Sequence, residues 1–359
     1  MLRRRATHRL LSPDDLKPSR DGMRVIGVFN PAAARRADGR IVMLARVAEA
    51  PTDRRSGFHA LPRIDADGGL VVEYLPEDQD TLIDPRKVVR AADGLMRLKF
   101  VSHIRAFLLD ETGTRVESEL PPLLAEGPYE TFGVEDPRIT VIDGTYFVTY
   151  VSVSEHGAAT SLATTRDFET YERHGIIFCP ENKDVVLLPE KVGGRFVALH
   201  RPNTFQRFCK PEMWLATSDD AVAWGGHRHV WSGRRAWDDD RIGAGPPPVR
   251  VAGRSGRPGG LLELYHGSRR ATKRGEVGAY QAGLLLLDPD DPARVLAHSP
   301  EPVMAAQHDW EMTGFVPNVV FPTGVIETDN QWQVYYGAAD THVGVAVFDL
   351  DDLMGALQP

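Results

Sequence analysis

The chain has 359 residues, 42% of them hydrophobic and 26% charged, so it can bury a substantial core and is not disordered. Its net charge of −8 is spread over mixed charges, which argues against a protein that lives on nucleic acid. No apolar run approaches the roughly 20 residues of a membrane span, and the two cysteines, Cys179 and Cys209, fit a reduced, cytoplasmic setting.

The first 22 residues are basic but lack the apolar stretch of a secretion signal. Their arginines, Arg3, Arg4, Arg5 and Arg9, predict a flexible arm in preference to a subunit contact. Helical periodicity is almost absent from the chain. We expect short helices only at 12–16 and 351–357.

The rest of the chain reads as short strands broken by Gly, Pro, Asp and Asn, which is an all-β pattern. A turn signal precedes an apolar or alternating run in five places: 41–47, 146–152, 195–201, 261–267 and 332–338. A second strand-like run precedes each of the last four: DPRITVI, DVVLLPEKV, PPPVRVA and VPNVVFPTGVI. Each such pair predicts a hairpin with a short loop.

Recurring hairpins predict radial repetition, and five of them favour a five-bladed β-propeller. The longer first gap, 47–133, holds further strand material at 70–75 and 97–108 and indicates an insertion. We therefore expect an N-terminal extension (1–22) and a single propeller domain (23–359). A β-sandwich or two β domains would be the alternative.

Charged groups recur where these strands end, at Arg46, Arg201, His266 and Asp340. In a propeller the ends of the inner strands converge on one face of a central channel. Isolated charges on apolar strands are usually solvated edge positions. Several at matching repeat positions predict one shared polar pocket.

The motif GVEDPRIT at 133–140 carries the strongest candidate acid, Asp136, beside Glu135 and Arg138. Acid/base chemistry needs a carboxyl held near a cation and away from bulk water. Pro137 fixes the backbone after Asp136 and predicts an extended conformation for Asp136 itself. The plainer interpretation is an Asp-Pro turn entering a strand.

The residue types in this pocket separate two chemistries. Inverting hydrolysis of a glycoside needs two carboxylates, one as acid and one as base for water. A set of Arg, Lys and His side chains instead suits an anion, which Arg can grip through two hydrogen bonds. One acid next to an anion site fits phosphorolysis, because phosphate replaces water and needs no base.

The chain resembles glycoside hydrolase family 130, the β-mannoside phosphorylases and β-mannosidases. The likeness runs from about residue 25 to 350 and rests on six segments in register: GVEDPRIT, NKDVVLLPEKVGGRFVALHRP (182–202), RIGAGPPPV (241–249), LYHG (264–267), GFVPNVVFPTG (314–324) and YYGAADTHVGVA (335–346). The resemblance implies a five-bladed β-propeller. It also implies that Asp136 is the proton donor, acting through a sugar hydroxyl.

The resemblance places two further sets of residues. The implied phosphate site comprises Lys183, Arg201, His266 and Tyr280. The implied mannose subsites comprise Asn30, Arg46, His103, Glu135, Arg138, Asp340 and Glu311. Three tryptophans, Trp231, Trp237 and Trp310, are equally suited to stacking on sugars and to packing between blades.

We therefore expect an inverting β-mannoside phosphorylase that acts on β-1,2-mannobiose or short oligomannosides and forms α-mannose 1-phosphate. Its N-terminal segment is most similar to the β-1,2 subgroup. Inorganic phosphate is the expected co-substrate, with no metal or organic cofactor and no nucleic-acid or membrane partner; a homo-oligomer is compatible with the sequence. A β-mannosidase, a β-1,4-mannoside phosphorylase and a sugar-binding propeller without activity are the alternatives.

Overall fold

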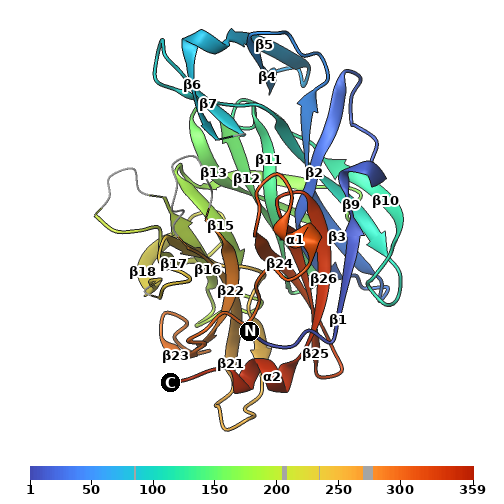
Figure 1. Ribbon diagram of the computed structural model, residues 1–359. Coiled ribbons are helices and arrows are strands. Elements are labelled where there is room, and N and C mark those ends of the chain that lie inside the picture. Colours follow the sequence, from blue (N-terminus) through green and yellow to red (C-terminus); the bar gives the residue numbers. More distant parts are fainter. Residues whose placement is uncertain (85, 204–207, 234, 270–277) are drawn as a thin grey trace.

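The structure is a computed structural model that describes residues 1–84, 86–203, 208–233, 235–269 and 278–359. Strands dominate these residues, and their α-helices are two short ones, α1 (Asp309–Met312) and α2 (Leu350–Gly355), as Figure 1 shows. The all-β prediction is therefore confirmed. Helix α2 matches the helix expected at 351–357, while 12–16 holds only a 3₁₀ turn at Pro13–Asp15.

All five predicted strand runs are strands, and each belongs to an antiparallel hairpin. The structure arranges most strands into five groups. Group one comprises β2 (Met23–Arg35), β3 (Ile41–Pro51), β9 (Val101–Leu109) and β10 (Val116–Leu123). Group two comprises β11 (Gly133–Ile142), β12 (Thr145–Ser154), β13 (Gly157–Thr165) and β14 (Glu172–Phe178). These two groups share one sheet through a single parallel pair, Gly133 and Ser102.

The remaining groups are separate sheets. Group three comprises β15 (Asn182–Leu187), β16 (Phe196–Pro202), β17 (Met213–Ser218) and β18 (Gly225–Trp231). Group four comprises β19 (Arg241–Gly243), β20 (Val249–Val251), β21 (Gly260–Ser268), β22 (Tyr280–Leu287) and β23 (Val295–His298). Group five comprises β24 (Val320–Thr328), β25 (Gln331–Ala338), β26 (His342–Asp349) and β1 (Ala6–Leu11).

Apolar side chains pack each group against the next. Val134 and Leu44 belong to one cluster between groups one and two, and Leu162 and Leu187 to another between groups two and three. Further clusters join group three to four, four to five, and five back to one. The strands are therefore apolar on both faces, as in β3, because a neighbouring group covers each face.

An excursion between β3 and β9 adds five strands: β4 (Phe58–Ile64), β5 (Leu70–Pro76), β6 (Asp80–Asp84), β7 (Lys87–Arg90) and β8 (Met96–Leu98). Figure 1 shows β4 to β7 at the top of the molecule, above groups one and two. The predicted insertion is confirmed, but its expected strand at 97–108 mostly belongs to group one as β9, because β9 pairs with β3 along its whole length.

The predicted flexible arm is wrong. Residues 6–11 form β1, which pairs antiparallel with β26, with Ala6 opposite Val347. Arg4 is buried and forms an ion pair with Glu311. The strand β26 offers an edge of unpaired backbone groups, and β1 satisfies them. No described helix is long and apolar enough to cross a membrane.

Candidate active site

The first strands of groups one, two and three carry an unusual backbone feature at matching places. Asn30, Asp136 and Asp184 have φ angles of 49°, 50° and 55°. The strand register shifts at each of them, as it does at a β-bulge. Asn and Asp tolerate this left-handed region better than other residues with a side chain. The extended conformation predicted for Asp136 is therefore wrong, because the bulge overrides the preference imposed by Pro137.

The bulges bring a carboxyl, an amide and a guanidinium together. Asp136 Oδ1 accepts hydrogen bonds from Asn30 Nδ2 at 2.8 Å and from Arg46 Nη1 at 3.1 Å. Arg46 Nη2 donates to Glu135 Oε1 at 2.6 Å. Lys183 Nζ lies 3.6 Å from Glu135 Oε2. Glu135 is thus held between two cations, as an orienting group would be.

The pKa of Asp136 reflects this arrangement. Burial raises the pKa of Asp136, but Arg46, Lys183 and the hydrogen bond from Asn30 outweigh burial and hold it below its usual range. The lowered pKa favours the carboxylate form of Asp136 at neutral pH. A proton donor needs the acid form, so a ligand that offsets the cations must precede proton transfer.

Asp340 adds a second carboxyl with the opposite behaviour. It follows β25, and Arg86 Nη1 lies 3.6 Å from its Oδ2. Burial raises the pKa of Asp340 to about 6, with help from the charges of Asp136 and Glu135 and against Arg86 and Arg46. Asp340 thus shares the electrostatic environment of the Asp136 cluster and titrates near neutral pH.

A second cluster, rich in cations, lies beside the first. Arg201 Nη1 and His266 Nε2 both contact Asp184 Oδ2, the histidine at 3.1 Å. Arg138 Nη2 lies 3.8 Å from Asp184 Oδ1. Burial raises the pKa of Asp184, but Arg201, His266 and Arg138 together hold it well below its usual range. Asp184 thus lies at the centre of the cluster, between two guanidinium groups and an imidazole.

Gly243 makes room for this cluster. A Cβ on Gly243 would overlap Asp184 Oδ2 and lie 2.7 Å from His266 Cε1. Only glycine lets the backbone pass so close to both side chains. The glycine of RIGAG is therefore part of the site, a role that its sequence context alone did not reveal.

Arg138 connects the two clusters. Its Nη1 donates to the backbone oxygen of Asp136 at 3.0 Å, and its Nε donates to Gly245 O at 2.6 Å. The Gly245 N–H donates in turn to Glu263 Oε1 at 3.0 Å. Burial raises the pKa of Glu263 to about 8. Sequence reasoning missed Asp184 and Glu263, because their burial and partners come from contacts between groups three, four and two.

Three predicted site residues lie outside these clusters. Tyr280 begins β22, with its ring centre 6.2 Å from that of His266. His103 lies opposite Val47 in the pairing of β3 with β9, and the two share one face of the sheet. Because neighbouring residues in a strand alternate faces, Arg46 lies on the other face, away from His103.

Glu311 is fully buried and accepts hydrogen bonds from Arg4 and Tyr336. Its carboxylate holds the N-terminal segment against group five rather than facing the Asp136 cluster. The three tryptophans also lie outside the clusters. Trp237 packs on Tyr265, and Trp310 stacks on Tyr336. Among the described residues, no three His, Cys, Asp or Glu side chains are grouped to hold a metal ion.

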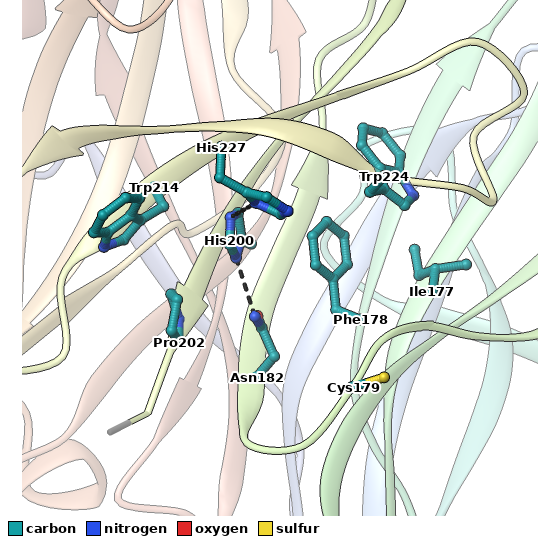
Figure 2. Close-up of a pocket in the computed structure, with 9 residues that line it drawn as sticks. All are labelled: Ile177, Phe178, Cys179, Asn182, His200, Pro202, Trp214, Trp224 and His227. Atoms are coloured by element: carbon teal, nitrogen blue, oxygen red, sulfur yellow. Dashed lines mark hydrogen bonds between the residues drawn. The ribbon is translucent and has the colours of Figure 1, made fainter. Parts of the chain in front are cut away.

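A separate pocket of about 480 Å³ lies behind the cation cluster and is lined by aromatic rings. Figure 2 shows His200 between Asn182 and His227, with Phe178 and Trp224 to one side and Trp214 to the other. His200 pairs with Trp214 across β16 and β17, whereas Arg201 pairs with Lys183, so the pocket and the cations occupy opposite faces of group three.

Comparison with known proteins gives consistent results. The model of one family, glycoside hydrolase family 130, described as beta-1,4-mannooligosaccharide phosphorylase, matches residues 112–358. A beta-1,2-mannobiose phosphorylase of Listeria innocua is 35% identical over 355 residues, covering 97% of this chain and 96% of that protein. A beta-1,2-mannobiose phosphorylase of a Thermoanaerobacter species is 37% identical over 258 residues, covering 70% of this chain and 79% of that protein.

The solved structure of the Listeria innocua protein in complex with beta-1,2-mannobiose has a TM-score of 0.88 to this fold and 34% sequence identity. The alignment covers 98% of this chain and 99% of that one. The similarity therefore extends over the whole arrangement of strands that builds the two clusters.

Proposed function

The chain belongs to glycoside hydrolase family 130, and from this premise we propose that it is an inverting β-mannoside phosphorylase. Its substrate is β-1,2-mannobiose or a short β-1,2-oligomannoside, as the names of these relatives indicate. Phosphate replaces the leaving mannose, and the product is α-mannose 1-phosphate.

The observation that best supports phosphorolysis is that one candidate acid, Asp136, lies next to a separate cluster that contains several cations. Inverting hydrolysis needs a second carboxylate that is free to activate water. Glu135 is engaged by Arg46 and Lys183, and Asp184 by Arg201 and His266. Each of these two carboxylates, which could otherwise serve as the base, is thus paired with at least one guanidinium or ammonium group, which favours phosphate over water as the nucleophile.

The charge balance supports the same reaction. Phosphate binds near Lys183, Arg201, His266 and Tyr280, and its negative charge offsets the cations that lower the pKa of Asp136. Asp136 then takes up a proton and donates it to the leaving oxygen, through a substrate hydroxyl. The phosphate oxygen attacks the anomeric carbon as the glycosidic bond breaks, and the proton lost by phosphate restores the acid.

Asn30, Arg46, Glu135, Arg138 and Asp340 are the proposed contacts of the reacting mannose. Asn30 and Arg46 also hold Asp136 in place. A β-mannosidase is the second candidate, because Asp340 is a carboxyl near the cluster that ionises near neutral pH and could activate water.

We infer that the five strand groups are the five blades of a β-propeller. Three arguments support this: four strands or more per group, a single strand pair joining groups one and two, and apolar clusters that link the groups in a cycle. Both cysteines are free and exposed, which supports the cytoplasmic setting expected from the sequence.

One experiment tests the proposal against its alternatives. The protein is incubated with β-1,2-mannobiose or β-1,4-mannobiose, with and without phosphate, and mannose 1-phosphate and mannose are quantified. We expect mannose 1-phosphate from the β-1,2 substrate only when phosphate is present. Mannose release without phosphate would identify a β-mannosidase. A preference for the β-1,4 substrate would assign the enzyme to β-1,4-mannosides. No turnover of either substrate would favour a sugar-binding protein without activity.

A further inference from the structure

A cleft of about 880 Å³ lies between the excursion and groups one and five. We call it the basic cleft, because its lining includes Arg24, Arg54, Arg55 and Lys99, and among the lining residues whose side chains the structure describes Glu77 is the one carboxylate. The whole chain has a net charge of −8, so this concentration of positive charge runs against the overall balance. A cleft lined by one sign of charge attracts a ligand of the opposite sign.

Three of these cations have no partner within the described part of the chain. No hydrogen bond or ion pair among those residues involves the side chain of Arg24, Arg54 or Lys99, whereas Arg55 pairs with Asp53 and lies over the ring of Tyr74. Arg24 and Arg54 are exposed, and Lys99 is half-buried. Their hydrogen-bond donors are therefore available to an anion.

The basic cleft adjoins the Asp136 cluster. Phe100 lines the cleft, and the guanidinium carbon of Arg46 lies 5.6 Å from the centre of its ring. Thr341, which also lines the cleft, follows Asp340 directly and accepts a hydrogen bond from the Phe315 backbone N–H. The cleft thus meets the active site on the side of Arg46 and Asp340, which belong to groups one and five.

The residues of the proposed phosphate site belong to groups three and four, whereas Arg46 and Asp340, next to the cleft, belong to groups one and five. Inversion requires phosphate to attack the anomeric carbon from the face opposite the leaving group. The leaving sugar must therefore point away from Lys183 and Arg201, which directs it towards the basic cleft. Phe58 and Phe315 supply apolar surface there, which suits the face of a sugar ring.

We propose that the basic cleft binds the leaving sugar and prefers, over the neutral mannose of β-1,2-mannobiose, a sugar that carries an anionic group, a phosphate or a carboxylate. The inference rests on the proposed phosphorylase function and adds its substrate class. Arg24, Arg54 and Lys99 bind the anion, and the acceptor hydroxyl lies towards Asp136. In the synthetic direction the same site takes an anionic sugar as the acceptor from α-mannose 1-phosphate.

The test is synthesis from α-mannose 1-phosphate with three acceptors: mannose, mannose 6-phosphate and mannuronate. We expect kcat/KM for at least one anionic acceptor to exceed that for mannose by roughly tenfold or more, as expected for charge-assisted hydrogen bonds. The two anionic acceptors distinguish phosphate from carboxylate recognition. Added salt should reduce the advantage.

Variants test whether the preference for anionic acceptors depends on the basic cleft. In the Arg54→Gln/Lys99→Gln double variant, the ratio of kcat/KM for the anionic acceptor to that for mannose should approach one. The Arg228→Gln variant removes an exposed arginine of β18, in group three, that pairs with Asp291, and should leave the ratio unchanged. Turnover of mannose with no preference for either anion would overturn this inference and leave the phosphorylase proposal intact. An equal change in the KM of α-mannose 1-phosphate with every acceptor would also overturn it, since the cleft would then bind the phosphate group of that donor.

Failure of all three acceptors, mannose included, would instead overturn the phosphorylase proposal and this inference with it.

Discussion

Replacing Asp136 by asparagine separates the chemistry of this residue from its place in the fold. Asp136 Oδ1 accepts hydrogen bonds from Asn30 and Arg46, and an amide oxygen can accept both. The amide has no acidic proton to transfer to a leaving group. The Asp136→Asn variant should therefore keep the geometry of the cluster and lose the acid.

The magnitude follows from the contacts. A positioned general acid contributes roughly 10²- to 10⁴-fold to a rate, which corresponds to about 3–5 kcal/mol of activation free energy. Breaking a buried ion pair costs about 3–5 kcal/mol of stability, but Arg46 keeps its pair with Glu135, so the loss here should be smaller. The variant should therefore fold and be impaired only in the transfer of a proton to the leaving group.

The assay uses two substrates that differ in the leaving group. β-1,2-Mannobiose needs a proton on the departing oxygen, whereas 4-nitrophenyl β-mannoside releases a phenolate that needs none. Phosphate-dependent formation of mannose 1-phosphate should fall about 10²- to 10⁴-fold with mannobiose and by much less with the nitrophenyl substrate. Asp219→Asn, which removes an exposed carboxylate paired with Arg195, serves as the control.

An equal loss on both substrates would show that Asp136 does not act as the proton donor. Full activity of the variant on mannobiose would place the acid elsewhere, with Asp340 the first residue to examine.

Three further predictions concern the surroundings of Asp136. Lys183→Gln should raise the KM for phosphate by roughly tenfold and change the KM for mannobiose little; an unchanged phosphate KM would move the anion site elsewhere. Gly243→Ala should displace Asp184, lower the activity and reduce the free energy of unfolding by about 1–3 kcal/mol. Gly225→Ala, which has open space around it, should change neither activity nor stability. Calorimetry measures the stability of both variants, and initial rates measure their activity.

The third concerns Glu263, whose pKa burial raises from 4.5 to about 8. The folded protein holds this proton more tightly than the unfolded chain, so stability should fall as pH rises from 4.5 to 8, by up to roughly 5 kcal/mol. Urea unfolding of Glu263→Gln should lack this fall, and parallel curves for both proteins would refute the assignment.

The strands were predictable because their signals are local. Turn dipeptides such as Asp143-Gly144 and alternating runs such as 146–152 mark hairpins within a few residues. Strand ends also pointed to Arg46, Arg201 and Asp340, and the structure brings these side chains close to Asp136 or Asp184. Their roles in catalysis stay predictions.

What the sequence did not reveal depends on contacts between distant residues. Asp184 begins an ordinary strand-like run, and only its contacts with Arg201 and His266 make it the centre of a cluster. The family resemblance implied that His103 lines a mannose subsite, but its register on β9 places it on the face of the sheet opposite to Arg46. The arginines of residues 1–9 suggested a solvated arm, because the partner of Arg4 lies more than 300 residues away.

The pairing of β1 with β26 has a consequence for how the protein is made. Residues 6–11 leave the ribosome early, yet their partner strand, residues 342–349, appears only after nearly all of the intervening chain. Such a non-local pairing slows folding and leaves β1 exposed in the meantime. The packing of group five against group one would then be completed only after synthesis of residues 342–349, and Asp340, which lies just before that strand, would join the Asp136 cluster at that moment.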